Sequence, residues 1–108
     1  MGQFSITNQP PHYHFILKNK SGETILKSFA YLSYDSCLAS IAEARNLAGN
    51  DANYERHREG DKFCFFLKNK KDQRIASSPL YDSPKECEYG IASVTVYAYV
   101  AVIEQEPI

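Results

Sequence analysis

Residues 14–48 recur at 64–98 with an offset of 50 residues and no gap, and this internal repeat constrains the fold more than any other feature. The clearest stretch is Leu-Lys-Asn-Lys, which begins at Leu17 and again at Leu67. Over the aligned segments 13 of 35 positions are identical, where ordinary composition would give about two. We interpret the chain as a tandem duplication of a unit about 50 residues long, so every structural prediction must hold in both copies.

The chain of 108 residues has the length of a single domain, which we expect to consist of two repeats at about 1–50 and 51–108. A net charge of −1 provides no overall field that would attract nucleic acid or an anionic membrane. There is no apolar run long enough to span a bilayer and no signal-peptide pattern at the start. Three cysteines without a C-x-x-C pair do not suit a disulfide framework, so we expect a cytoplasmic protein.

Alternating apolar residues predict the same strands in both copies. In 13–18 the alternation places Tyr13, Phe15 and Leu17 on one face of a strand, and 63–68 repeats it with aromatic and aliphatic residues. Polar turns follow, and then a short strand around Ile25 and its counterpart Ile75. Segments 4–7 and 54–57 precede these hairpins and are predicted as strands too. Each copy therefore contributes three strands.

The segments after the hairpins are predicted as helices. In the first copy Ser33 serves as the N-cap of a helix that reaches residue 48. In the second copy residues 94–100 have a strand-like composition, yet the apolar stripe of the first helix recurs there at the same spacing. Ser83 and Pro84 also form a strong helix start. We predict a helix over 84–97 and a last strand over 99–104.

The two copies together resemble the YegP-like family of small bacterial proteins, whose function is uncharacterised. The resemblance rests on the strand ends at 15–18 and 65–68, on Tyr-x-Ser at 31–33 and 81–83, and on the helix that follows each. It implies an α+β fold of tandem β3-α-β repeats, which form one antiparallel sheet with exchanged terminal strands and two helices on one face. It also implies a monomer, and it supplies no reaction, cofactor or catalytic residue.

The cysteines and histidines are weak candidates for chemistry. Cys37 and Cys87 lie on the apolar helical stripe and are interpreted as core residues, while Cys64 is the thiol we expect to be more accessible. His12 and His14 share a strand face and could offer two metal ligands, but a third would have to come from His57. We interpret the histidines as ordinary side chains and expect no metal site.

The repeated hydroxyl residues also have structural explanations. A catalytic serine needs an adjacent base, and no histidine falls in this segment of either copy. Ser33 and Ser83 are explained as helix caps, and the tyrosine two residues before each cap is expected to anchor the corner between strand and helix. Ser28 and Ser78 are the remaining repeated pair, and they too are interpreted as structural because no histidine base is near them in the sequence.

The sheet face away from the helices is the remaining candidate surface. It is expected to expose the following residues: His14, Ile16, Lys18, Lys62, Cys64, Phe66 and Lys68. The apolar pair Ile16 and Phe66 favours a protein contact. Basic residues beside an aromatic ring would also suit single-stranded nucleic acid.

We therefore expect a small non-enzymatic interaction module with an unknown protein partner, whose biological role the sequence does not define. Single-stranded nucleic-acid binding on the open sheet face is the alternative. No catalytic constellation, cofactor site or metal site is predicted.

Overall fold

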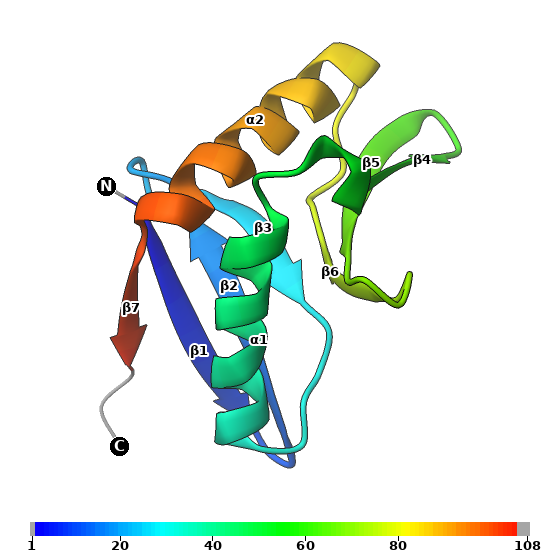
Figure 1. Cartoon of the computed structure of the whole chain (residues 1–108). Helices are drawn as coiled ribbons and strands as arrows, with labels where there is room; N and C mark the ends of the chain where they lie inside the picture. The colour runs from blue at the N-terminus through cyan, green and yellow to red at the C-terminus, as the bar shows by residue number, and fades with distance from the viewer. Residues whose placement is uncertain (1, 106–108) are drawn as a thin grey trace.

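The computed structural model describes residues 2–105, and these contain seven strands and two α-helices (Figure 1). In chain order the elements are β1 (Gln3–Gln9), β2 (His12–Lys18), β3 (Thr24–Ser28), α1 (Tyr34–Leu47), a short 3-10 helix (Asp51–Asn53), β4 (Tyr54–Glu59), β5 (Lys62–Lys68), β6 (Arg74–Ser77), α2 (Pro84–Val100) and β7 (Val102–Gln105). Each half contributes three strands followed by a helix, as predicted. The fold class is α+β.

All seven strands form one sheet in the order β4-β5-β6-β3-β2-β1-β7. The prediction of an antiparallel sheet is wrong at one edge, because β7 runs parallel to β1, with Val102 opposite Gln3. The other ladders are antiparallel. A tight hairpin imposes antiparallel pairing, but β7 follows a helix, so its direction depends on where that helix ends. The terminal strand of the second half thus pairs with the first strand of the first half.

The two halves of the sheet meet along a very short ladder. β3 and β6 pair only at Lys27 with Ser77 and at Ser28 with Ala76. Beyond these pairs each strand stays beside its own hairpin, as the isolated bridges from Tyr13 to Tyr31 and from Phe63 to Tyr81 show. Backbone hydrogen bonding between the halves is therefore slight at the centre of the sheet.

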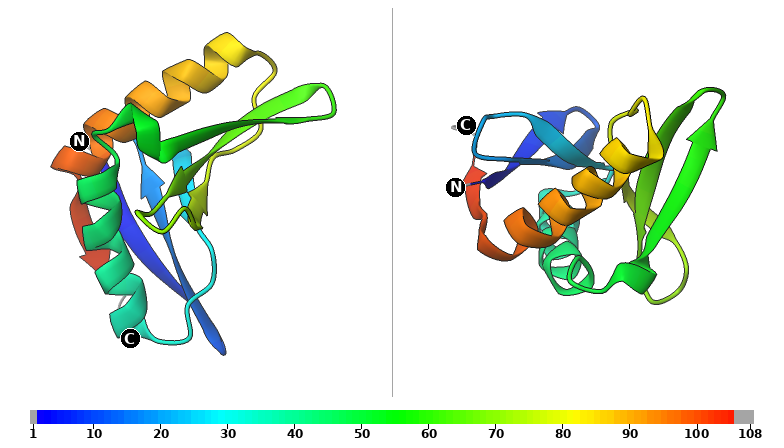
Figure 2. Two further views of the ribbon diagram at one scale, coloured as in Figure 1. Left: turned by 45° about the vertical axis from the view of Figure 1, so that its right-hand side comes forward. Right: turned by 90° about the horizontal axis from the view of Figure 1, so that it is seen from above.

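Both helices cover the same face of the sheet, and the sheet curls around them (Figure 2). α1 packs against β1, β2 and β5, and α2 packs against β1, β2, β3 and β5. Each helix therefore contacts strands from both halves. The helices connect the halves where the sheet itself does so weakly.

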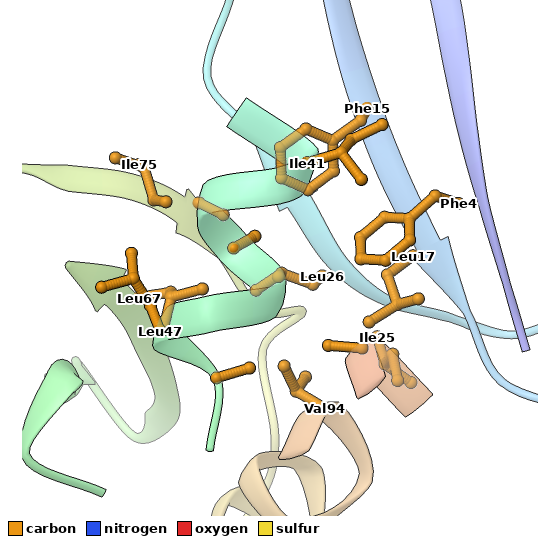
Figure 3. Packing of buried hydrophobic residues seen from close by; sticks show 14 of the residues in the cluster. Phe4, Phe15, Leu17, Ile25, Leu26, Ile41, Leu47, Leu67, Ile75 and Val94 are labelled. Carbon is orange, nitrogen blue, oxygen red and sulfur yellow. The ribbon is translucent and has the colours of Figure 1, made fainter. Parts of the chain in front are cut away.

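A single apolar cluster fills the space between sheet and helices (Figure 3). Its fully buried members include Phe4, Phe15, Phe65 and Ile41, so the face predicted from Phe15 and its repeat partner does point to the core. A β-bulge in the β2–β3 ladder brings consecutive residues of β3, Ile25 and Leu26, into this cluster. The β5–β6 ladder has the same irregularity at the same place.

α2 confirms the helix that the repeat predicted against local strand propensity, although it continues to Val100 and thereby shortens the last strand. Its side chains at the repeated stripe, among them Cys87 and Val94, are buried. Ser83 Oγ accepts the N–H of Glu86, as expected for an N-cap. Within residues 2–105 no helix is both long and apolar enough to cross a membrane.

The turn between β2 and β3 is organised by one asparagine. Asn19 Oδ1 accepts the backbone N–H groups of Ser21 and Glu23 at 3.0 and 3.1 Å. Gly22 then takes a φ of +83°, which glycine adopts without strain. The turn after β5 repeats this arrangement around Asn69, with Asp72 at a φ of +64°. Both turns therefore are polar, as the sequence predicted, and each contains one residue with a positive φ.

The C-terminal ends of the two helices satisfy each other's carbonyl groups. Arg45 on α1 donates to the carbonyl oxygen of Ala98 at 3.0 Å, and also to that of Ala101. Its guanidinium lies 5.1 Å from the centre of the Phe4 ring. In the other direction Tyr54 Oη and Thr95 Oγ1 donate to the Ala48 carbonyl at 2.7 and 3.1 Å. These contacts fix where α2 stops and where β7 can start.

Replacing Arg45 tests this helix-end contact. Arg45→Met retains an aliphatic stem but leaves the last carbonyls of α2 without their charged donor, and we expect a loss of about 2 kcal/mol in the free energy of unfolding. Arg45→Lys keeps the charge, which favours a helix C-terminus, and should recover part of the loss. Urea denaturation measures both, and equal stability of the two variants would contradict the role given to the positive charge.

Gly90 provides a second test, because α2 packs closely on Tyr81 there. A Cβ atom at Gly90 would lie 2.5 Å from Tyr81 Oη and 3.1 Å from Phe65 Cε2. Gly90→Ala should therefore destabilise the fold by about 1–3 kcal/mol, although alanine favours helix. The matched control is Gly49→Ala, where a Cβ meets nothing within 4 Å. Denaturation should show Gly49→Ala within about 1 kcal/mol of the parent, and a similar effect of the two changes would refute this packing argument.

Candidate functional site

The sheet face opposite the helices, called the bare face below, is crossed by a row of side chains that the ladder registers define. From β4 to β1 this row consists of Glu55, Phe66, Ser77, Lys27, Ile16 and Ser5. The row is mixed in chemistry, unlike the buried face beneath it. Its two apolar members, Phe66 and Ile16, stand on different hairpins.

The predicted apolar pair of Ile16 and Phe66 is not contiguous. β6 and β3 separate their strands, so the two side chains lie about 14 Å apart at the usual strand spacing. The strand order, which the sequence did not provide, produces this separation. The prediction that Ile16 and Phe66 together form an apolar contact surface is therefore wrong. The apolar neighbour of Phe66 is a different residue.

Phe66 is instead the centre of a compact group, called the Phe66 cluster below. Phe29, from the chain just after β3, stacks on its ring with centroids 6.5 Å apart and planes 16° from parallel. The His57 ring meets Phe66 edge-on at 5.7 Å. The Arg74 guanidinium lies 4.0 Å from the Phe66 ring centre. Phe66 itself is half-buried, and Phe29 is 47% exposed.

An ion pair fixes Arg74 over this ring. Its Nε donates to Glu55 Oε1 at 3.0 Å, and a second guanidinium nitrogen donates to the other carboxylate oxygen. The hydrogen bond from Arg74 lowers the pKa of the Glu55 carboxyl group, against a smaller opposing effect of burial. The ion pair thereby holds the guanidinium beside the Phe66 ring.

Most basic side chains of the bare face already have acidic partners. Lys62 pairs with Asp82, and Lys68 pairs with Asp72. Together with Arg74, three cations of this surface are therefore locally neutralised. Lys18 and Lys27 make no ion pair within the part of the chain that the structure describes. Three of the five cations named on this face are therefore neutralised by a neighbouring carboxylate.

Two residues expected on the bare face are not exposed. His14 is 8% exposed and Cys64 is 5% exposed, so the prediction that both are accessible is wrong. Strand alternation alone therefore does not determine which side chains of this face are exposed. Ile16, Lys18, Lys62, Phe66 and Lys68 are half-buried.

The thiols lack the features of nucleophiles. Cys37 and Cys87 are buried in the core, as predicted, and burial raises the pKa of Cys37 to about 11. Burial likewise raises the pKa of Cys64, with Glu59 adding in the same direction and Arg74 opposing. A reactive thiol needs the opposite shift and access to solvent. The three cysteines therefore act as small apolar side chains.

The histidines do not assemble a metal site. His12 and His14 lie on β2, while His57 lies on β4 at the far edge of the sheet. Among residues 2–105 no group of three His, Cys, Asp or Glu side chains is placed to hold a metal ion. His57 Nε2 lies 3.2 Å from a carboxylate oxygen of Glu59 and its ring contacts Phe66.

The repeated serines have structural partners. Ser28 Oγ accepts the N–H of Phe15 at 2.8 Å and donates to the carbonyl of Phe29 at 2.9 Å. Ser78 repeats this with Phe65 and Pro79. Where β3 and β6 end, each serine hydroxyl therefore takes the place of a backbone carbonyl as the acceptor for an N–H group of the neighbouring strand.

The repeated tyrosines tie the strand ends to the hairpins. Tyr31 exchanges two backbone hydrogen bonds of 2.7 Å with Tyr13, and its hydroxyl bonds to Ser40 Oγ. Tyr81 exchanges the corresponding backbone bonds with Phe63. The predicted corner anchors are thus confirmed.

Sequence reasoning missed Phe29, Glu55 and Arg74 as neighbours of Phe66. These three positions correspond at the 50-residue offset to Pro79, Ser5 and Thr24, none of which is aromatic or charged. The two halves have the same packing requirements, so the fold does not demand these residues. The sequence does contain one signal for these residues, because they are positions at which the two copies differ in charge or aromaticity.

Comparison with known proteins places the chain in a family. A domain of unknown function, DUF1508, matches residues 59–104. A UPF0339 protein encoded at the 5′ region of the ptx operon of Stutzerimonas stutzeri is 36% identical over 99 residues, 90% of this chain and 89% of that protein. YegP of Escherichia coli K12 is 40% identical over 83 residues, 76% of each chain.

The chain belongs to the UPF0339 family. The solution structure of Escherichia coli YegP, described as a protein of unknown function, matches with a TM-score of 0.91 at 33% identity over 97% of this chain and 92% of that one. A UPF0339 protein from Shewanella oneidensis gives 0.89 at 26% identity, over 96% and 90%. These relatives confirm the α+β fold. The single match at 59–104 does not bear out a tandem repeat as a family property.

The Glu55–Arg74 pair gives a measurable titration. In the folded protein the Glu55 pKa should lie below that of an unfolded glutamate, and Arg74→Gln should return it towards the ordinary value. Because the folded-state pKa is lowered, this carboxylate adds stability above about pH 4 and loses it as the pH falls further. Side-chain carboxyl shifts in an NMR titration measure the pKa, and an unchanged Glu55 value in Arg74→Gln would contradict the pairing.

Proposed function

We propose that this protein is a non-enzymatic interaction module that binds a protein partner through the Phe66 cluster on the bare face. The observation that carries the proposal is the stack of the exposed Phe29 ring on the half-buried Phe66 ring, with the guanidinium of Arg74 against Phe66. Aromatic and arginine side chains dominate the binding energy of protein interfaces. None of the three has an aromatic or charged counterpart at the 50-residue offset, so the fold does not require them, and this supports a role in binding.

The charge distribution favours a protein over a nucleic acid. Binding of single strands relies on free cations along a groove as well as on stacking rings. Here Lys62, Lys68 and Arg74 are already paired with carboxylates, and the chain as a whole has a net charge of −1. An aromatic patch with a neutralised rim is more typical of a protein interface.

The chemistry of the described residues supports a binding role over catalysis. The cysteines are buried thiols with raised pKa values, and the repeated serines are bonded to backbone groups. The two polar side chains of the Phe66 cluster are each paired with a carboxylate, His57 with Glu59 and Arg74 with Glu55. The proposal therefore assigns no reaction to the bare face.

Site-specific photocrosslinking tests the proposal in living bacteria that carry the protein. A benzophenone amino acid in place of Phe29 should capture a protein, because this side chain is 47% exposed beside Phe66. The control position is Leu32, which is 79% exposed but outside the cluster. The captured protein should then bind the purified module, and Phe66→Ala should weaken that binding by about 30-fold.

Three outcomes would refute the protein-binding role. The same product from Phe29 and Leu32 would show non-specific capture. Unchanged affinity of a folded Phe66→Ala variant, with melting temperature as the check, would exclude the cluster as the binding centre. A crosslink that a nuclease removes would identify nucleic acid as the partner.

A further inference from the structure

A cavity of about 550 Å³ lies on the helix side of the molecule and shares no residue with the Phe66 cluster. It is bounded by the β2–β3 turn, the chain between β6 and α2, and the first half of α2. The residues that define its chemistry are Glu23, Leu80, Tyr81, Glu86, Tyr89 and Gly90. Its size falls within the usual range for small-molecule sites.

The Tyr81 hydroxyl is available within this cavity. In the first half the corresponding Tyr31 hydroxyl is hydrogen-bonded to Ser40, but Gly90 occupies the equivalent place in the second half. Tyr81 Oη consequently has no hydrogen-bond partner among residues 2–105, and it lies 2.5 Å from the position that a Cβ of residue 90 would take. Burial raises the pKa of Tyr81, and the charge of Glu23 adds to this, so the hydroxyl stays neutral.

Two carboxylates give the cavity a negative charge. Glu23 Oε1 accepts from Asn19 Nδ2 at 3.2 Å, and Glu86 Oε2 accepts the N–H of Asp82 at 3.0 Å. Each leaves its second oxygen without a donor in the described part of the chain. Asp82 also lines the cavity but pairs with Lys62. Among the described lining residues none is basic.

The remaining wall is apolar and aromatic. Leu80 and Tyr89 are 58% and 62% exposed, which is high for such side chains on a packed helix and its preceding loop. The Tyr89 ring already attracts a cation, since Lys85 Nζ lies 5.9 Å from its centre. Aliphatic chains can pack on these groups while a positive head contacts the carboxylates.

We propose that this cavity binds an aliphatic ammonium or guanidinium group. The methylene chain would pack on Leu80 and Tyr89, and the N–H donors would meet Glu23, Glu86 and the free Tyr81 hydroxyl. Such a group can come from a free polyamine or from a lysine or arginine side chain of another protein. The proposal does not depend on the bare face, so either can fail alone.

An NMR titration of the ¹⁵N-labelled protein tests this with spermidine, agmatine and blocked lysine as probes, and with glutarate as the anionic control. The three cations should shift the amide signals of Thr24, Gly90 and Ser93 in a saturable way. Glutarate should leave them unchanged. Tighter binding of spermidine or agmatine than of blocked lysine identifies a free amine as the ligand, and the reverse order identifies a protein side chain.

Matched variants separate a site from diffuse attraction. Glu23→Gln combined with Glu86→Gln keeps the side-chain carbonyl acceptors and should weaken binding at least about tenfold. Glu43→Gln removes a carboxylate from α1, outside the cavity, and should leave the affinity unchanged. Gly90→Ser, which would give Tyr81 the partner that Tyr31 has, should also weaken binding if the variant folds.

Three results would overturn the proposal. One is the absence of saturable shifts up to about 10 mM of each cation. Another is an equal loss of affinity in Glu43→Gln and in the double variant. The third is an equal response to glutarate.

Discussion

The structure depends on the way the two helices satisfy each other's last carbonyl groups. A helix C-terminus needs partners for its free carbonyls, and here each helix provides them for the other. Arg45 holds the end of α2, and Thr95 with Tyr54 holds the end of α1. Because Arg45 also lies over Phe4, the end of α2 is positioned beside β1. That position lets the chain add β7 as the seventh strand.

The groups that we propose to bind a partner or ligand are not repeated in the two halves, although the halves are built alike. Core positions such as Phe15 and Phe65 are the same in both halves, since both hairpins pack on the same helix pair. Phe29 from the first half meets Phe66 and Arg74 from the second, and Gly90 leaves the Tyr81 hydroxyl without the partner that Ser40 gives to Tyr31. The common framework supplies stability, and the differences supply surfaces that a partner or ligand could distinguish.

The sequence allowed most of the secondary structure to be predicted, because the repeat added information to local propensity. The helix over Val94 and Tyr97 was correct only because its buried stripe matched that of α1. The parallel direction of β7 and the pairing of β3 with β6 could not be predicted, since both depend on tertiary packing. The same limit applies to the bare face. Burial of His14 and Cys64 does not follow from strand alternation, and the meeting of Phe29 with Phe66 depends on the path of the chain just after β3.

The seam of two residue pairs between β3 and β6 has a consequence for how the molecule comes apart. The strands of each hairpin are joined by backbone hydrogen bonds along their length. The junction between the halves has only two residue pairs and depends on the apolar side chains packed between it and the helices. We expect denaturant to loosen the helix pair first and the junction with it, leaving two separate hairpins as the last ordered pieces. Amide exchange would then be fastest at Lys27 and Ser77, in the geometric middle of the sheet, rather than at its margins.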